Sequence, residues 1–120
     1  MKNIILIMTL FSTLFGAKAQ QNDSIKILDA QTYKDTISVK KVQLIDVRTP
    51  EEYKSGHIKN AINIDFFSRK FNVEFNKLDK EKPVYIYCRS GSRSRQTANK
   101  LAAMRFKEIY DLKGGILNYN

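Results

Sequence analysis

The chain has 120 residues, with 21 lysines and arginines against 12 aspartates and glutamates, and a formal net charge of +9 at pH 7. This length suits one small hydrophobic core and excludes two. The basic residues are mostly scattered among acidic ones and no recognisable nucleic-acid-binding motif is present, so we expect no nucleic-acid partner. The positive excess suits a small anionic substrate instead.

The first part of the chain, residues 1–19, has the pattern of a secretory signal peptide. Lys2 is followed by an apolar run from Ile4 to about Phe15, and Ala17 and Ala19 fit an A-x-A cleavage site. We therefore expect cleavage after Ala19 and export to the periplasm or medium of a bacterium. The alternative is an uncleaved membrane anchor, but the apolar run is short for a span of about 20 residues. After cleavage we expect no stable membrane insertion.

Residues 20–24 are polar and predict a flexible tail, and residues 25–120 form the predicted folded domain. Within it, IKIL (residues 25–28) predicts a short strand and residues 29–37 a helix. VQLIDV (residues 42–47) predicts a second strand. Thr49 as N-cap, Pro50 at the first helical position and two glutamates in the first turn then predict a short helix, which Ser55 and Gly56 end.

The second half of the chain continues the alternation. AINI (residues 61–64) predicts a small strand, residues 66–78 a helix, and VYIY (residues 84–87) the clearest strand of the sequence. A helix is expected from about Arg93 to Phe106, followed by a strand in EIYDL and a turn or short helix in GGILNY. Strands that alternate with helices predict an α/β fold, with a central, mostly parallel sheet flanked by helices on both faces.

Cys88 is the only cysteine of the chain, so it cannot form an internal disulfide. A lone thiol in an exported protein is either buried and inert or reactive. Its neighbours favour the second interpretation. Cys88 stands at the carboxyl end of a predicted parallel strand, which is where open α/β sheets bind their ligands.

The loop after Cys88 predicts an anion-binding site. It consists of Arg89, Ser90, Gly91, Ser92, Arg93 and Ser94. Small residues let backbone N–H groups converge on one point, and the start of a helix adds positive potential. A sulfur at that point is stabilised as the thiolate, and Arg89 and Arg93 would hold an oxyanion. The alternatives are a buried cysteine and an ordinary connecting loop, but arginines at a helix start are unfavourable without an anion.

Three stretches together resemble a known family: LIDVRTPEEYKSGHIKNAINI, VYIYCRSGSRS and the later RFKEIYDLKGGILNY. They resemble a single-domain rhodanese, a thiosulfate sulfurtransferase-like protein, over nearly all of the chain that follows the predicted signal peptide. The resemblance implies a rhodanese-like fold and a sulfurtransferase. Cys88 would take sulfur from an anionic donor such as thiosulfate, become a persulfide, and pass the sulfur to cyanide or a thiol, with a thioredoxin-like protein as one candidate acceptor. No metal or organic cofactor is implied.

Asp46, Arg48 and His57 lie in the other stretch of the resemblance, and we interpret them as mainly structural. Asp46 and Arg48 are expected to pair with each other or with loop backbone, and Arg48 could also contribute near the site. His57 is expected to organise its loop, because a thiolate formed by the Cys88 loop needs no base.

Two other functions stay open. One is an exported persulfide carrier, or a non-catalytic binding module with the same fold. The other, weaker one is a phosphatase-like anion hydrolase. Phosphatases with a similar loop have arginine six positions after the cysteine, whereas here that position is Ser94.

Overall fold

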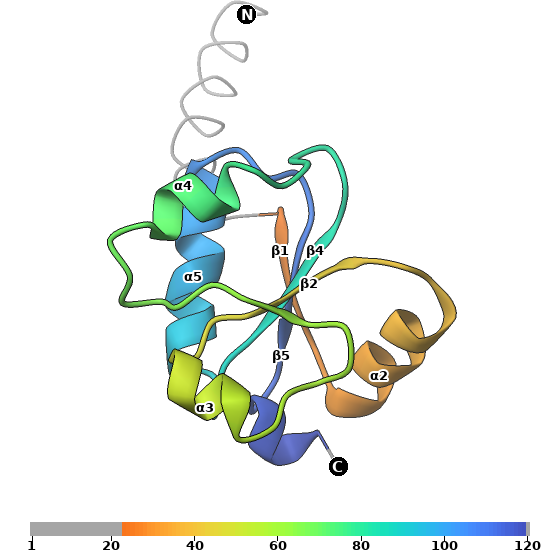
Figure 1. Ribbon diagram of the computed structural model, residues 1–120. Coiled ribbons are helices and arrows are strands. Elements are labelled where there is room, and N and C mark those ends of the chain that lie inside the picture. Colours follow the sequence, from red (N-terminus) through yellow and green to blue (C-terminus); the bar gives the residue numbers. More distant parts are fainter. Residues whose placement is uncertain (1–22, 120) are drawn as a thin grey trace, which may run out of the picture.

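The computed structural model describes residues 23–119, which form a five-stranded sheet with the order β1-β5-β4-β2-β3 (Figure 1). Every neighbouring pair of strands is parallel. The strands are β1 (Ile25–Leu28), β2 (Gln43–Asp46), β3 (Ile62–Asn63), β4 (Val84–Tyr87) and β5 (Ile109–Leu112). The predicted parallel sheet is confirmed.

The helices are α2 (Ala30–Val39), α3 (Pro50–Lys54), α4 (Phe71–Phe75) and α5 (Ser92–Ala103), with a short 3₁₀ turn, η1 (Ile116–Asn118), after β5. In this described part of the chain, none of them combines the length and the apolar character that a membrane crossing requires. The predicted signal peptide and residues 20–22 of the predicted tail lie outside the described residues. Asp23 and Ser24 form a turn, and the Ser24 carbonyl accepts a hydrogen bond from the Ile109 amide at 2.8 Å.

Two hydrophobic clusters cover the two faces of the sheet, so the prediction of helices on both faces is confirmed (Figure 1). On one face, Phe75 of α4 and Leu101 of α5 pack against Ile86 of the central strand. On the other face, Tyr33 of α2 packs beside Tyr85, and its hydroxyl donates to the Ile86 carbonyl at 2.9 Å. Because β4 is buried from both sides, its sequence is continuously apolar, as parallel central strands require.

The helix predicted over residues 66–78 is wrong in extent, since α4 covers only Phe71–Phe75. Local hydrogen bonds compete with the helix before it: the Asp65 side chain accepts from the Phe67 amide and the Ser68 hydroxyl accepts from the Lys70 amide, both at 2.9 Å. These bonds hold residues 65–70 in turns, although Phe66 and Phe71 still reach the core.

The helix predicted to reach Phe106 ends at Ala103. Arg105 adopts a left-handed conformation with φ of 75°. The Phe106 amide donates to the Leu101 carbonyl and the Arg105 amide to the Ala102 carbonyl, both at 3.0 Å, which is a Schellman end. Glycine is the usual residue at that position, so an arginine there gives no sequence signal that the helix ends.

Phe75→Ala tests the packing between α4 and the sheet. The Phe75 side chain is fully buried, and its ring lies 4.7 Å from that of Phe71 and 6.4 Å from that of Phe106. We expect the free energy of unfolding, measured by urea denaturation, to fall by about 3–5 kcal/mol. Val73→Ala, on the exposed side of the same helix, should change it by less than about 0.5 kcal/mol. Equal losses in the two variants would contradict this packing.

Candidate functional site

Cys88 follows β4 directly, at the carboxyl edge of the third of the five strands. β2 leads through α3 to β3 on one side of the sheet, and β4 leads through α5 to β5 on the other. The loops that leave β2 and β4 therefore diverge. This divergence is the position at which open parallel sheets bind ligands.

The Cys88 sulfur receives a backbone hydrogen bond. The Gly91 amide donates to Sγ at 3.0 Å, and Ser94 Oγ lies 3.5 Å from the same sulfur. Gly91 has φ of 115°, a conformation that side chains rarely adopt, and this turns its amide back toward Cys88. A donor aimed at the sulfur, together with the start of α5 behind it, favours negative charge on that atom.

The segment after β5 holds the Cys88 loop through backbone hydrogen bonds. The Ile116 amide donates to the Cys88 carbonyl at 2.9 Å and the Leu117 amide to the Arg89 carbonyl at 3.2 Å. Gly115 has φ of 68° and ψ of −169°, and a Cβ there would collide with the backbone of Arg89 and Ser90. The geometry of the loop therefore depends on a glycine that is distant from the loop in the sequence but in direct contact with it in space.

Arg93 is held by a carboxylate. Its guanidinium donates to both carboxylate oxygens of Glu52 on α3, at 2.7 and 3.0 Å. This bonding is the main reason why the pKa of Glu52 falls from its ordinary value of 4.5 to about 2. Glu52 also completes the capping box of α3 with Thr49. Arg89, the other predicted anion contact, is exposed, and it forms no ion pair with any carboxylate of residues 23–119.

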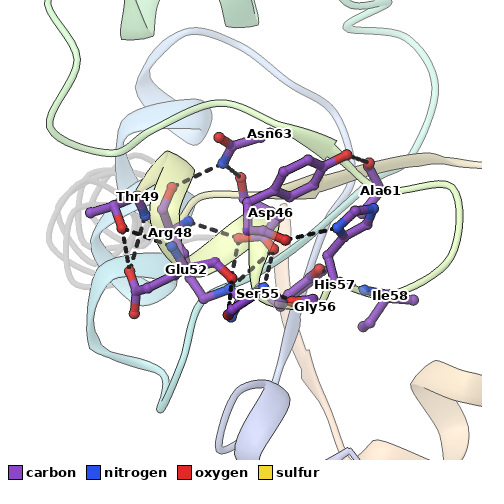
Figure 2. Close-up of polar contacts among 12 residues, drawn as sticks. Asp46, Arg48, Thr49, Glu52, Ser55, Gly56, His57, Ile58, Ala61 and Asn63 are labelled. Atoms are coloured by element: carbon purple, nitrogen blue, oxygen red, sulfur yellow. Dashed lines mark hydrogen bonds and ion pairs between the residues drawn. The ribbon is translucent and has the colours of Figure 1, made fainter.

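Asp46 and Arg48 pair with each other at the end of β2 (Figure 2). Arg48 Nη2 lies 2.7 Å from Asp46 Oδ2 and also donates to the Gly56 carbonyl at 2.7 Å. Burial alone would lower the pKa of the Arg48 guanidinium, but the hydrogen bonds and charge of Asp46 raise it above its ordinary value. The buried pair thus ties the end of the strand to the end of α3.

His57 is exposed and stacks on the ring of Tyr53, with 3.7 Å between ring centroids (Figure 2 shows it at the turn after α3). Its Nδ1 lies 2.9 Å from the Tyr53 carbonyl oxygen. Within residues 23–119 no hydrogen bond joins His57 to Cys88. These contacts organise the turn.

The serines of the loop differ in exposure. Ser90 and Ser92 are exposed, whereas Ser94 is fully buried under the loop. Nothing in the sequence pattern indicated that Glu52 binds Arg93, or that Gly115 packs on the loop. No group of three His, Cys, Asp or Glu side chains among the described residues is arranged to hold a metal ion.

The comparisons with known proteins agree with this geometry. The rhodanese-like domain family matches residues 29–120. The thiosulfate sulfurtransferase GlpE of Coxiella burnetii is 36% identical over 81 residues, which covers 68% of this chain and 74% of that protein. The chain belongs to the rhodanese-like domain family. A rhodanese-like domain protein of Staphylococcus aureus has a similar structure, with a TM-score of 0.71 and 29% identity over 79% of this chain and 91% of that one.

Another relative is the tRNA uridine(34) hydroxylase of Pelagibacter ubique, which is 36% identical over 105 residues. The chain is matched over 87% of its length but spans only 34% of that protein. The match therefore covers only a part of that protein.

Glu52→Gln tests the ion pair with Arg93. Glutamine keeps the capping box but loses the charge, so we expect the free energy of unfolding at pH 7 to fall by about 1 kcal/mol. The pKa of Glu52 is lowered on folding, so its stabilisation is complete above about pH 4.5 and is lost as the pH falls through about 2. The difference between the variant and the wild type should therefore shrink at pH 2.5. Glu51 lies on the same turn but is exposed, so Glu51→Gln should lower the free energy of unfolding less at pH 7. An equal loss in the two variants would contradict the role of the ion pair.

Gly115→Ala tests the contact beneath the loop. We expect a loss of more than about 2 kcal/mol in the free energy of unfolding, because this backbone conformation is nearly restricted to glycine and the methyl group meets backbone atoms. Gly56→Ala is the matched control, since Gly56 also has positive φ but open space around it. Folded Gly115→Ala should also show an altered rate of alkylation of Cys88 by iodoacetamide. Two variants that behave alike in both measurements would show that the contact does not shape the loop.

Proposed function

We propose that the chain is a sulfurtransferase that carries a sulfane sulfur on Cys88. The observation that supports this most is the Gly91 amide aimed at the Cys88 sulfur, in a loop of small residues at the carboxyl edge of the sheet. The family membership and the GlpE relative support the same chemistry.

The proposed reaction has two displacements at sulfur. The Cys88 thiolate attacks the outer sulfur of thiosulfate, an Sγ–S bond forms, and the bond to the sulfonate sulfur breaks so that sulfite leaves with the electron pair. Cyanide or a thiolate then attacks the outer sulfur of the persulfide and releases the Cys88 thiolate. The loop amides would stabilise the charge on the persulfide, and Arg89, which is exposed beside Cys88 in the chain, would attract the anionic donor.

A second candidate is a persulfide carrier that receives its sulfur from another thiol persulfide. The observation that favours it is the Arg93 guanidinium, which is already bound by the Glu52 carboxylate. An arginine neutralised in this way attracts a dianion such as thiosulfate less strongly than a free one does. A donor with less negative charge depends less on a free arginine, so the pairing of Arg93 with Glu52 would weaken its binding less.

The test is the intact mass of the protein before and after incubation with thiosulfate, beside the Cys88→Ser variant. We expect the wild type alone to gain one sulfur atom, and cyanide to remove it with release of thiocyanate. A low-molecular-weight persulfide is the parallel donor. A gain from the persulfide but not from thiosulfate would favour the carrier, and a gain by Cys88→Ser would show that Cys88 is not the sulfur-carrying residue.

We also propose that the chain is exported and cleaved after Ala19, on the basis of Lys2, the apolar run and the A-x-A pattern. The same mass measurement on protein from the native host tests this proposal. A mature chain that begins at Gln20 would support it, and a chain that retains Met1 to Ala19 would contradict it.

A further inference from the structure

A groove lies at the amino end of β2, at the edge of the sheet opposite the one that carries Cys88. It consists of two adjoining cavities of about 650 and 560 Å³, which share residues 40–43, in the segment between α2 and β2 and the first residue of β2 (Figure 1). Pro83, just before β4, also lines it, whereas Cys88 follows the other end of β4. The groove is therefore separate from the candidate sulfurtransferase site.

The floor of the groove is apolar and draws on both faces of the sheet. Leu78 packs against one of the two hydrophobic clusters, and Ile37 and Val42 pack against the other. Val39 and Ile62 also line the groove, and they are 81% and 57% exposed. Exposed aliphatic side chains that gather around a hollow, rather than standing singly, indicate a contact surface.

The edge of β2 is open along this groove. β2 pairs with β4 over all four of its residues, but β3 pairs only with Ile45 and Asp46. Asn60, before β3, lies in a turn with φ of 73°, so β3 does not extend further toward the groove. Within residues 23–119, Gln43 and Leu44 therefore have no strand partner on this side. An open edge of this kind can accept an extended segment from another chain.

The wall of the groove is held in place by the Gln43 side chain. Its Nε2 donates to the Asp79 carbonyl at 3.0 Å, and its Oε1 accepts from the Asp79 amide at 2.7 Å. Nε2 also donates to the Pro83 carbonyl at 3.2 Å. These bonds tie the segment before β4 to the start of β2. A wall that is already ordered lowers the entropic cost of binding.

Lysines line the groove with few carboxylates to neutralise them. Lys40, Lys41 and Lys59 are exposed, and none of the three forms an ion pair within residues 23–119. Lys82 Nζ lies 3.9 Å from Oδ2 of Asp79, the one carboxylate among the described lining residues. The groove therefore carries a net positive charge, which attracts an anionic partner and disfavours a basic one.

We propose that this groove binds an extended, acidic segment of a partner protein, which adds to the open edge of β2. The backbone of the segment pairs beside Gln43 and Leu44. Its carboxylates face Lys40, Lys41 and Lys59, and its aliphatic side chains enter the apolar floor. Because the groove receives side chains from both faces of the sheet, it suits the alternation of an added strand.

The observations favour a protein segment over other occupants. The open strand edge pairs with a polypeptide backbone, which a lipid surface does not offer. Residues 1–22 of this chain contain Lys2 and Lys18 and no acid, so their charge opposes binding among the lysines. A partner held here leaves the edge with Cys88 uncovered, and the inference stands whether or not Cys88 carries sulfur.

The test is the binding of a short fluorescein-labelled peptide in which glutamate and valine alternate, followed by fluorescence anisotropy. We expect micromolar affinity that weakens with added salt. Lys40→Glu/Lys41→Glu should weaken binding about tenfold, since two attractive charges become repulsive. Ile62→Ser should weaken it about threefold through the lost apolar contact. In the labelled wild type, the peptide should shift the backbone amide resonances of Gln43 and Leu44.

Arg69→Glu/Lys70→Glu is the matched control. Arg69 and Lys70 are also adjacent and exposed, and they line neither cavity. This variant has the same net charge as Lys40→Glu/Lys41→Glu but should weaken binding by less than about twofold. Both variants should keep the wild-type midpoint of urea denaturation, because the changed side chains are exposed. A peptide with lysine in place of glutamate should not bind.

Four results would overturn the inference. Absence of binding by the acidic peptide would reject the groove as its site, and equal weakening in the two double variants would mean that net charge alone attracts it. A wild-type dimer that Lys40→Glu/Lys41→Glu converts to a monomer in sedimentation would make a second copy the occupant. Binding of phosphatidylglycerol vesicles through Lys40 and Lys41, without amide shifts from the peptide at Gln43 and Leu44, would make a lipid surface the partner.

Discussion

The peptide between Arg89 and Ser90 lies against the backbone of Gly115 with no room for a Cβ atom, and the site depends on this contact. Together with the bonds from η1, it fixes the path of the loop, and this path lets the Gly91 amide reach the Cys88 sulfur. The donor is therefore positioned by backbone packing, which loses less conformational entropy than a long side chain would. A preorganised donor needs no rearrangement when charge develops on the sulfur.

Most of the positive charge near the loop is already paired. Three arginines at the carboxyl edge each face a carboxylate: Arg48 with Asp46, Arg93 with Glu52, and Arg95 with Asp111. Of the two arginines that the sequence offers as anion contacts, Arg93 therefore also connects elements around the site, whereas Arg89 has no ion pair within residues 23–119. The field at the sulfur then comes largely from neutral donors, namely backbone amides and the start of α5, and such donors suit a small charged sulfur.

The sequence predicted the fold well wherever an element depends only on residues close to it in the chain. The apolar run of β4 and the cap at Thr49 depend on neighbouring residues, and both are confirmed. The helix at residues 66–78 failed because Asp65 bonds the backbone of its own turn, which hydrophobic spacing does not reveal. At the site, the position of Cys88 followed from its strand and loop. The contact of Glu52 with Arg93 joins residues 41 positions apart, so no local pattern contains it.

The sheet order has a consequence for how the chain folds. β1 pairs with β5, and the segment that clamps the Cys88 loop follows β5. Parallel pairs between distant segments form slowly, because a long loop must close first. In a growing chain, Cys88 is synthesised before Gly115 and Ile116, so the nascent thiol is for a time without the backbone that later covers it. A reactive sulfur in that state is open to oxidants. Until β5 docks, the Cys88 loop therefore lacks the backbone contacts that hold it in place.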